Sequence, residues 1–148
     1  MIELVLTDEA ATTALGARLA PLLARGDAVL LRGGLGAGKS TLARGLIRAL
    51  TSPGEDVPSP TFTLVQTYAA EPPVAHLDLY RLEHASEVDE LGLDDLLNDG
   101  AVVIEWPERM GAALPPDRLD IELRAEGGGR RAAVTGHGRW TGRESELE

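Results

Sequence analysis

The chain has no cysteine, a single lysine and no long hydrophobic run among its 148 residues. Without cysteine it has neither a disulfide scaffold nor a thiolate metal centre, and this composition fits a reducing compartment. No apolar stretch is long enough to cross a bilayer. The first ten residues, MIELVLTDEA, lack the basic region and the extended apolar core of a secretory signal peptide. We therefore expect a cytoplasmic protein without a membrane segment.

Basic residues are outnumbered by acidic ones. Lysine and arginine total 14 against 24 aspartate and glutamate residues, so the formal net charge is -10. Such a charge repels nucleic-acid phosphates at long range, and we do not expect the chain to bind DNA or RNA by itself. Its length and its hydrophobic content of 43% suit one folded domain. We place that domain at residues 1–136, followed by a flexible glycine-rich tail at residues 137–148.

The stretch GGLGAGKST, residues 33–41, matches the P-loop pattern of glycine, four residues, glycine, lysine and serine or threonine. The preceding DAVLLRG contains a short apolar run that is typical of a buried strand. In the following TLARGLIRAL, leucines recur on one face of a predicted helix. A glycine loop between a strand and a helix is the setting that this motif requires. A glycine-rich turn with a chance Lys-Ser pair is the alternative, and it does not explain that setting.

The chemistry of this loop predicts a site for a nucleoside triphosphate and Mg²⁺. Its glycines let the backbone approach a phosphate closely, and the loop amides with the helix N-terminus face the anion. Lys39 can reach the β- and γ-phosphates, and Ser40 can bind Mg²⁺. The predicted nucleotide-binding residues of the loop are Gly33, Gly34, Leu35, Gly36, Ala37, Gly38, Lys39, Ser40 and Thr41.

Lys39 is the only lysine in the chain. A drift of composition toward arginine explains the other basic positions but not this exception. A compact ammonium fits a tight phosphate cradle in a way that a planar guanidinium does not, so the lone lysine indicates function. The lack of a second lysine also argues against a GTPase, because the guanine-reading N-K-x-D motif needs one.

Strands and helices alternate along the rest of the chain. A helix should follow Thr7 or Asp8 and kink or end near Pro21, and a Ser86–Asp89 capping box should begin two short helices separated at Gly92. The loop at residues 51–60 is rich in proline. Strands are predicted at residues 2–6, 61–68, 74–80, 101–104, 119–125 and 131–135, besides the one before the P-loop.

Residues after the P-loop helix are candidates to sense the γ-phosphate or Mg²⁺. Thr61 or Thr63 can offer a hydroxyl, although threonines are also common at strand starts. Asp78 lies in an apolar strand, where P-loop proteins often hold Mg²⁺, or it is an exposed residue of an alternating strand. His76 shares a face with Asp78 and is more simply a packed residue.

The buried strand at residues 101–104 ends in Glu105 and Trp106. Open α/β sheets carry their chemistry beyond the carboxyl ends of strands. Glu105 is therefore a candidate to orient or deprotonate an attacking water, and Trp106 is a candidate to stack on a nucleobase. A strand-end charge and a core indole are the alternatives.

Four segments together resemble the TsaE (YjeE) family of bacterial ATPases in tRNA threonylcarbamoyladenosine synthesis: GGLGAGKST, SPTFTLVQTY, HLDLYRL and VIEWPERM. The P-loop is generic, but its combination with the other three is specific. The resemblance runs from Ile2 to Leu123. It implies an α/β fold, namely a P-loop NTPase three-layer sandwich with a mixed parallel and antiparallel sheet.

The resemblance also implies roles for particular residues. Lys39, Glu105 and Thr61 match the catalytic positions, Ser40 and Asp78 match the Mg²⁺ side, and Trp106 matches the aromatic beside the nucleotide. TsaD and TsaB are the implied partners; they attach threonylcarbamoyl to tRNA, and ATP hydrolysis by this subunit would support repeated turnover. Contact with tRNA is then indirect, through the complex.

Two other functions stay open. A small-metabolite kinase usually needs lid and acceptor-binding elements with several basic residues, whereas the region after the P-loop helix is short and acidic. A nucleotide-sensing adaptor would bind ATP and a partner but hydrolyse little. The arginines at positions 130, 131, 139 and 143 give the C-terminal part local positive charge, either for RNA or an acidic partner or as a solvated tail.

Overall fold

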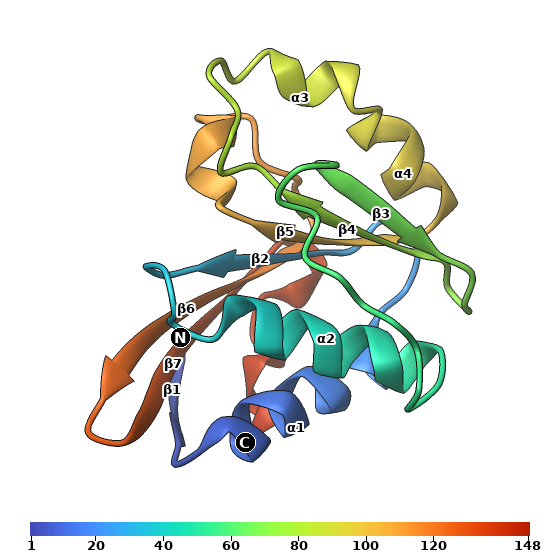
Figure 1. The fold of residues 1–148 in the computed structure, drawn as a ribbon. Coiled ribbons are helices and arrows are strands. Elements are labelled where there is room, and N and C mark those ends of the chain that lie inside the picture. The colour runs from blue at the N-terminus through green and yellow to red at the C-terminus, as the bar shows by residue number, and fades with distance from the viewer.

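The computed structural model describes residues 1–148 as one seven-stranded sheet with helices on both faces (Figure 1). The order of the strands is β1-β7-β6-β2-β5-β4-β3. The elements in chain order are β1 (Ile2–Leu6), α1 (Glu9–Leu19), β2 (Ala28–Arg32), α2 (Lys39–Leu50), β3 (Val65–Tyr68), β4 (Val74–Asp78), α3 (Glu87–Glu90), α4 (Leu93–Asp99), β5 (Ala101–Glu105), β6 (Arg118–Glu126) and β7 (Gly129–His137).

The sheet is mixed, as predicted. β2 runs parallel to both β5 and β6, and β4 runs parallel to β5. The pairs β3–β4, β6–β7 and β1–β7 are antiparallel. Figure 1 shows α1 and α2 against one face and α3 and α4 against the other, which gives the three-layer α/β arrangement. No helix has the length and apolar character needed to span a membrane.

The two central parallel strands are buried on both faces. Along β2, Val29 and Leu31 belong to the core under α1 and α2, whereas Ala28 and Leu30 belong to the core under α3 and α4. A strand covered on both sides reads as a continuous apolar run, which is why the sequence shows AVLL without alternation. The carboxyl end of β2, from which the P-loop leaves, is therefore held rigidly.

Two glycines bring α1 against the P-loop helix. A Cβ on Gly16 would lie 2.2 Å from the carbonyl oxygen of Leu42, and one on Gly45 would lie 2.3 Å from that of Thr13. Only glycine allows the backbones to approach this closely. The helix α1 begins at Asp8, whose carboxylate accepts a hydrogen bond from the backbone N–H of Ala11 at 2.8 Å.

Residues 137–148 differ from the flexible tail that we predicted. They form 3₁₀ turns at Gly138–Trp140 and Arg143–Leu147, and the side chains of Trp140 and Leu147 are fully buried in the core. Arg139 binds the buried carboxylate of Asp27 at the start of β2. The polar and glycine-rich composition concealed these apolar anchors, whose partners lie far away in the sequence.

Two local predictions were also wrong. The strand expected at residues 61–68 begins only at Val65, because the Thr61 side chain bonds to Asp78 and the chain turns there, with Leu64 at a φ of 70°. Ser86 makes no capping hydrogen bond, although Gly92 does separate α3 from α4 as predicted.

Candidate nucleotide-binding site

The P-loop leaves β2 and ends at Gly38, which caps the N-terminus of α2 in a left-handed conformation with a φ of 106°. Gly33 has a φ of 143°, and a Cβ there would lie 2.5 Å from the carbonyl oxygen of Leu123. Non-glycine residues rarely adopt these backbone angles. The two glycines therefore allow the loop to fold back over the first turn of α2, whose amides lack helical partners.

A cavity of about 460 Å³ lies over this loop, and polar side chains and loop backbone form most of its lining. One end contains Thr61, Asp78, Glu105 and Trp106, which the sequence had indicated from separate segments. The other end is bounded by the start of α1 and by the β6–β7 hairpin. The fold thus gathers the predicted site residues around one cavity of a size typical of ligand sites.

Two carboxylates lie side by side at the carboxyl ends of β4 and β5. Asp78 and Glu105 are direct partners in the parallel register, and they are only 4% and 2% exposed. Ser40, in the first turn of α2, donates a hydrogen bond from Oγ to Glu105, with distances of 3.1 and 3.3 Å to the two carboxylate oxygens. Hydroxyl and carboxylate oxygens are the ligands that Mg²⁺ prefers.

Ser40, Glu105 and Asp78 therefore fit a magnesium ion by the chemistry of their donor atoms. No cluster of three or more histidine, aspartate or glutamate side chains is arranged as a metal site.

The structure distinguishes between the two candidate threonines. Thr61 donates from Oγ1 to Asp78 Oδ2 at 3.2 Å, and its hydroxyl lies 2.7 Å from that of Ser59. Thr63 instead accepts a hydrogen bond from Gln66 at 3.0 Å, away from the cavity lining. Of the two threonines, Thr61 is thus the one that contacts Asp78 and lines the cavity.

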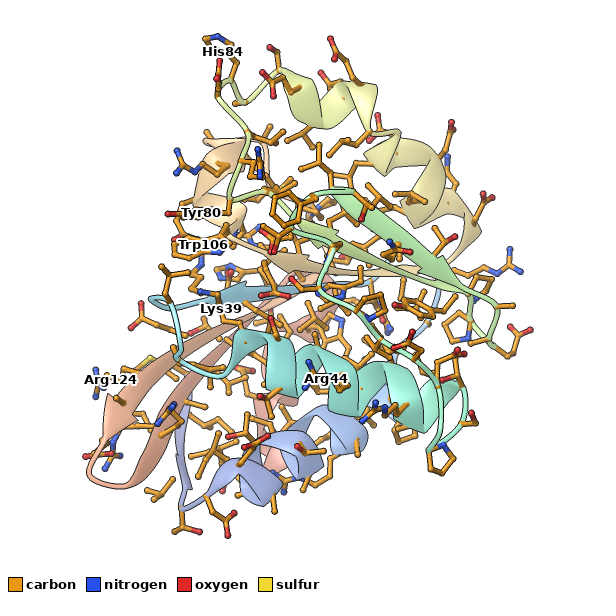
Figure 2. The ribbon with its side chains drawn as sticks, in the orientation of Figure 1. Lys39, Arg44, Tyr80, His84, Trp106 and Arg124 are labelled. Carbon is orange, nitrogen blue, oxygen red and sulfur yellow. The ribbon has the colours of Figure 1, made fainter.

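Lys39 lies under the ring of Trp106, with its Nζ atom 3.7 Å from the ring centroid. Its ammonium donates to the carbonyl oxygens of Gly33 and Gly34, the latter at 3.1 Å. The Tyr80 ring in turn lies 4.9 Å from that of Trp106 and is tilted by 49° to it, and Figure 2 shows the three labelled side chains one above another in the view. This contact places Trp106 at the lysine end of the cavity, which does not favour the nucleobase stacking that we predicted.

Burial lowers the pKa of Lys39 below its ordinary value of 10.5. The negative charges of Glu105, Glu108 and Asp78 oppose this effect and raise the pKa in part. The desolvation of the ammonium is therefore the dominant influence in the free chain. Burial disfavours the charged form of Lys39, and a bound anionic ligand stabilises that form. The desolvated ammonium therefore favours binding of an anion.

Two residues of the site were not identified from the sequence. His76 is buried on β4, and its Nε2 atom lies 2.6 Å from Glu105 Oε2, so it orients that carboxylate from behind. Arg130, on β7, donates to the carbonyl oxygens of Gly36 and Ala37 in the loop. The only signal for Arg130 was its place among the C-terminal arginines, and the register of β4 against β5 was needed for His76.

Comparison with known proteins agrees with this arrangement. The family model described as "Threonylcarbamoyl adenosine biosynthesis protein TsaE" matches residues 6–133. The chain belongs to the TsaE family. The resemblance carried by the four sequence segments is thereby confirmed, and so is the fold class.

Relatives in the TsaE family align along most of the chain. A protein from Streptomyces coelicolor is 44% identical over 136 residues, which cover 85% of this chain and 91% of that one. One from Nostoc sp. is 41% identical over 142 residues, or 91% and 86% of the two chains. Both are described as tRNA threonylcarbamoyladenosine biosynthesis protein TsaE. A solved structure, "Crystal structure of Bacillus subtilus YdiB", matches 99% of this chain and 90% of its own with a TM-score of 0.78 and 29% identity.

Proposed function

We propose that the chain is the ATP-binding and ATP-hydrolysing subunit of tRNA threonylcarbamoyladenosine biosynthesis, and that it works with TsaD and TsaB in the cytoplasm. Membership of the TsaE family supports the pathway. The observation that carries the activity is the contact between Ser40 and Glu105 at the foot of the P-loop. It joins the helix that faces the phosphates to a buried carboxylate on the adjacent strand.

This contact changes the division of roles that the sequence suggested. Because Glu105 accepts directly from Ser40, we assign Glu105 with Ser40 to the Mg²⁺ side. When bound, the ion neutralises charge on the phosphates. Asp78 and its partner Thr61 lie one strand further from the P-loop, and we assign this pair to orient the attacking water.

The reaction is attack of a water oxygen on the γ-phosphorus of ATP. The bond from that phosphorus to the oxygen bridging it to the β-phosphate breaks, giving ADP and inorganic phosphate. Most of the catalysis of such a step is positioning and electrostatic stabilisation. Lys39 would exchange its carbonyl partners at Gly33 and Gly34 for phosphate oxygens, while Trp106 shields the ammonium from water.

A nucleotide-sensing adaptor with little hydrolysis is the second candidate. It is favoured by the contacts of Lys39, whose ammonium is held by the carbonyl oxygens of its own loop. Binding must displace these contacts, so turnover of the isolated chain is expected to be slow. The two candidates differ in what partner proteins do to the rate.

The deciding experiment is steady-state hydrolysis of Mg·ATP by the chain alone and with TsaB, TsaD and tRNA from the same organism. We expect weak activity alone, a rise with the partners and loss of activity in Lys39→Ala. Arg44→Ala is the matched control, because Arg44 is a cation on the same helix that does not line the cavity.

Each other outcome has a distinct meaning. Wild-type nucleotide affinity in Lys39→Ala would overturn the P-loop assignment. Hydrolysis that is near zero both with and without the partners would favour the nucleotide-sensing adaptor over the ATPase. Activity indifferent to the partners but stimulated by a small hydroxyl or carboxyl compound would point to a metabolite kinase.

A further inference from the structure

We propose that Arg130 is a positioning residue that fixes the phosphate-binding loop before nucleotide arrives. This inference rests on the proposed function and deepens it, since it concerns the same cavity. Arg130 lies on β7, 93 positions after Ala37 in the chain, in the part of the sequence where we found no family motif. It acts through the loop backbone and is therefore distinct from the residues that meet the nucleotide.

The guanidinium of Arg130 bridges the β6–β7 hairpin and the second half of the loop. Nε donates to Ala37 O at 2.9 Å, and Nη2 donates to Gly36 O at 2.8 Å. Nη1 donates to Gly129 O at 2.9 Å, which ties the fork to its own strand. These are charge-assisted bonds from one rigid plane, so they fix direction as well as distance.

The direction of those carbonyls decides where the loop amides point. In a trans peptide the C=O and the following N–H point in opposite directions. Holding Ala37 O against Arg130 therefore turns the N–H of Gly38 the other way. Gly38 N–H has no hydrogen-bond partner within the chain, and it precedes the free amides at the start of α2. Arg130 thus sets the first donor of the anion site.

Ala37 is itself buried in the core and donates from its N–H to Gly34 O at 3.2 Å, but the two residues before it have little support besides Arg130. Gly36 is exposed, and the neighbouring Leu35 side chain is 78% exposed and packs on no core. Glycine-rich backbone loses much conformational freedom when it is ordered, so a loop that is fixed in advance binds more tightly. Lys39 holds the first half through Gly33 and Gly34, but it must release them to reach phosphate. The Arg130 contacts can persist through that change.

The adjacent Arg131 provides a matched control. Successive residues of a strand face opposite sides of the sheet. Arg131 accordingly pairs with Glu126 at 2.6 Å and Glu3 at 3.4 Å, and it does not line the cavity. Replacing either arginine removes the same charge from the molecule, but only one replacement frees the loop.

The test compares Arg130→Ala, Arg130→Lys and Arg131→Ala with the wild-type chain. Affinity for Mg·ADP is measured by titration with a fluorescent ADP analogue, and amide NMR follows Gly38 without nucleotide. We expect Arg130→Ala to weaken ADP binding about tenfold, the scale of one lost charge-assisted bond. Arg130→Lys should bind ADP as weakly as Arg130→Ala, since one ammonium cannot replace the several donors of the planar guanidinium. Millimolar guanidinium should restore part of the ADP affinity of Arg130→Ala. Arg131→Ala should bind like wild type.

The NMR readout separates positioning from a general loss of structure. The Gly38 amide should shift in both Arg130 variants and remain unchanged in Arg131→Ala. If Arg130→Ala binds Mg·ADP with wild-type affinity while Lys39→Ala abolishes binding, the proposed role of Arg130 is overturned. The proposed function then stays intact. Wild-type ADP affinity in Arg130→Lys would show that the planar guanidinium is not required and that its positive charge is sufficient. Failure of the wild-type chain to bind nucleotide would overturn both proposals.

Discussion

The charge state of one side chain, that of Lys39, should control how nucleotide binding responds to pH. Burial lowers its pKa below 10.5, and only the ammonium form attracts phosphate. Binding is therefore strongest below the lowered pKa, where the ammonium form predominates. Affinity for Mg·ADP should therefore fall as the pH rises through the lowered pKa, below the range in which a solvated lysine deprotonates. Fluorescence titrations at a series of alkaline pH values measure this.

Stability of the nucleotide-free chain should respond to the same group with the opposite sign. Between the lowered pKa of Lys39 and 10.5, the unfolded chain binds more protons than the folded one, so the free energy of unfolding gains from this group as pH rises. An affinity that stays level up to the pH at which free lysine titrates would contradict the assignment of a desolvated ammonium.

The sequence identified single residues of the site better than their pairings. Lys39 and Ser40 follow from a local pattern, and that pattern carries its own chemistry. Ser40 and Glu105 are 65 positions apart in the sequence, and Arg130 and Ala37 are 93 positions apart. Each pair meets only because the fold brings two distant elements together. No local pattern encodes such distances, so the neighbours of Glu105 and Asp78 could be identified only from the register of the sheet.

At the level of elements, the close packing of α1 on α2 predicts the effect of Gly45→Ala. Alanine is the better helix former by about 1 kcal/mol. A Cβ at this position would, however, meet the Thr13 carbonyl oxygen at 2.3 Å, and overpacking costs about 1–3 kcal/mol. Because the obstacle is backbone that cannot rotate away, we expect a net loss of about 1–2 kcal/mol in the free energy of unfolding.

Urea denaturation measures this loss, and Gly54→Ala is the matched control. A Cβ on Gly54 would meet nothing within 4 Å, and its backbone lies outside the left-handed region. That substitution should leave stability unchanged or raise it by up to about 1 kcal/mol. A gain in stability for Gly45→Ala would show that the helices separate at little cost.

Elements were predicted well where burial alone shapes the sequence. The uninterrupted apolar runs of β2 and β5 agree with their prediction, and the strands predicted at residues 119–125 and 131–135 lie within β6 and β7. The prediction failed at residues 61–64, where a side-chain bond to Asp78 overrides the preference of threonine for strands. Propensity cannot anticipate a competing polar partner from another strand.

For the molecule as a whole, the packing of the last residues onto the core predicts a large effect of Trp140→Ala. The indole is fully buried within the core shared by α1, α2 and the sheet. Removing a buried aromatic side chain costs about 3–5 kcal/mol, whereas in a frayed tail it would cost nothing. We therefore expect a lower urea midpoint and a lower melting temperature.

Arg143→Ala is the control for this measurement. Arg143 lies over the Trp140 ring, 4.5 Å from its centroid, but its side chain is partly solvated. Its loss removes the cation and leaves the indole buried, so stability should change by less than about 1 kcal/mol. An equal effect of the two substitutions would mean that the cation above the ring, and not burial, holds the segment.

The antiparallel pairing of β1 with β7 also dictates an order of events during synthesis on the ribosome. Ile2 pairs with Val134, so the first strand to emerge must wait for one of the last before its edge of the sheet can close. Contacts between such distant segments form late, because loop closure must precede them. The lysine and serine of the P-loop emerge early, but the arginine that holds the loop arrives on β7. We therefore expect a nascent chain that has exposed its whole P-loop to be still poorly prepared to capture nucleotide, and to become competent only when the β6–β7 hairpin has formed.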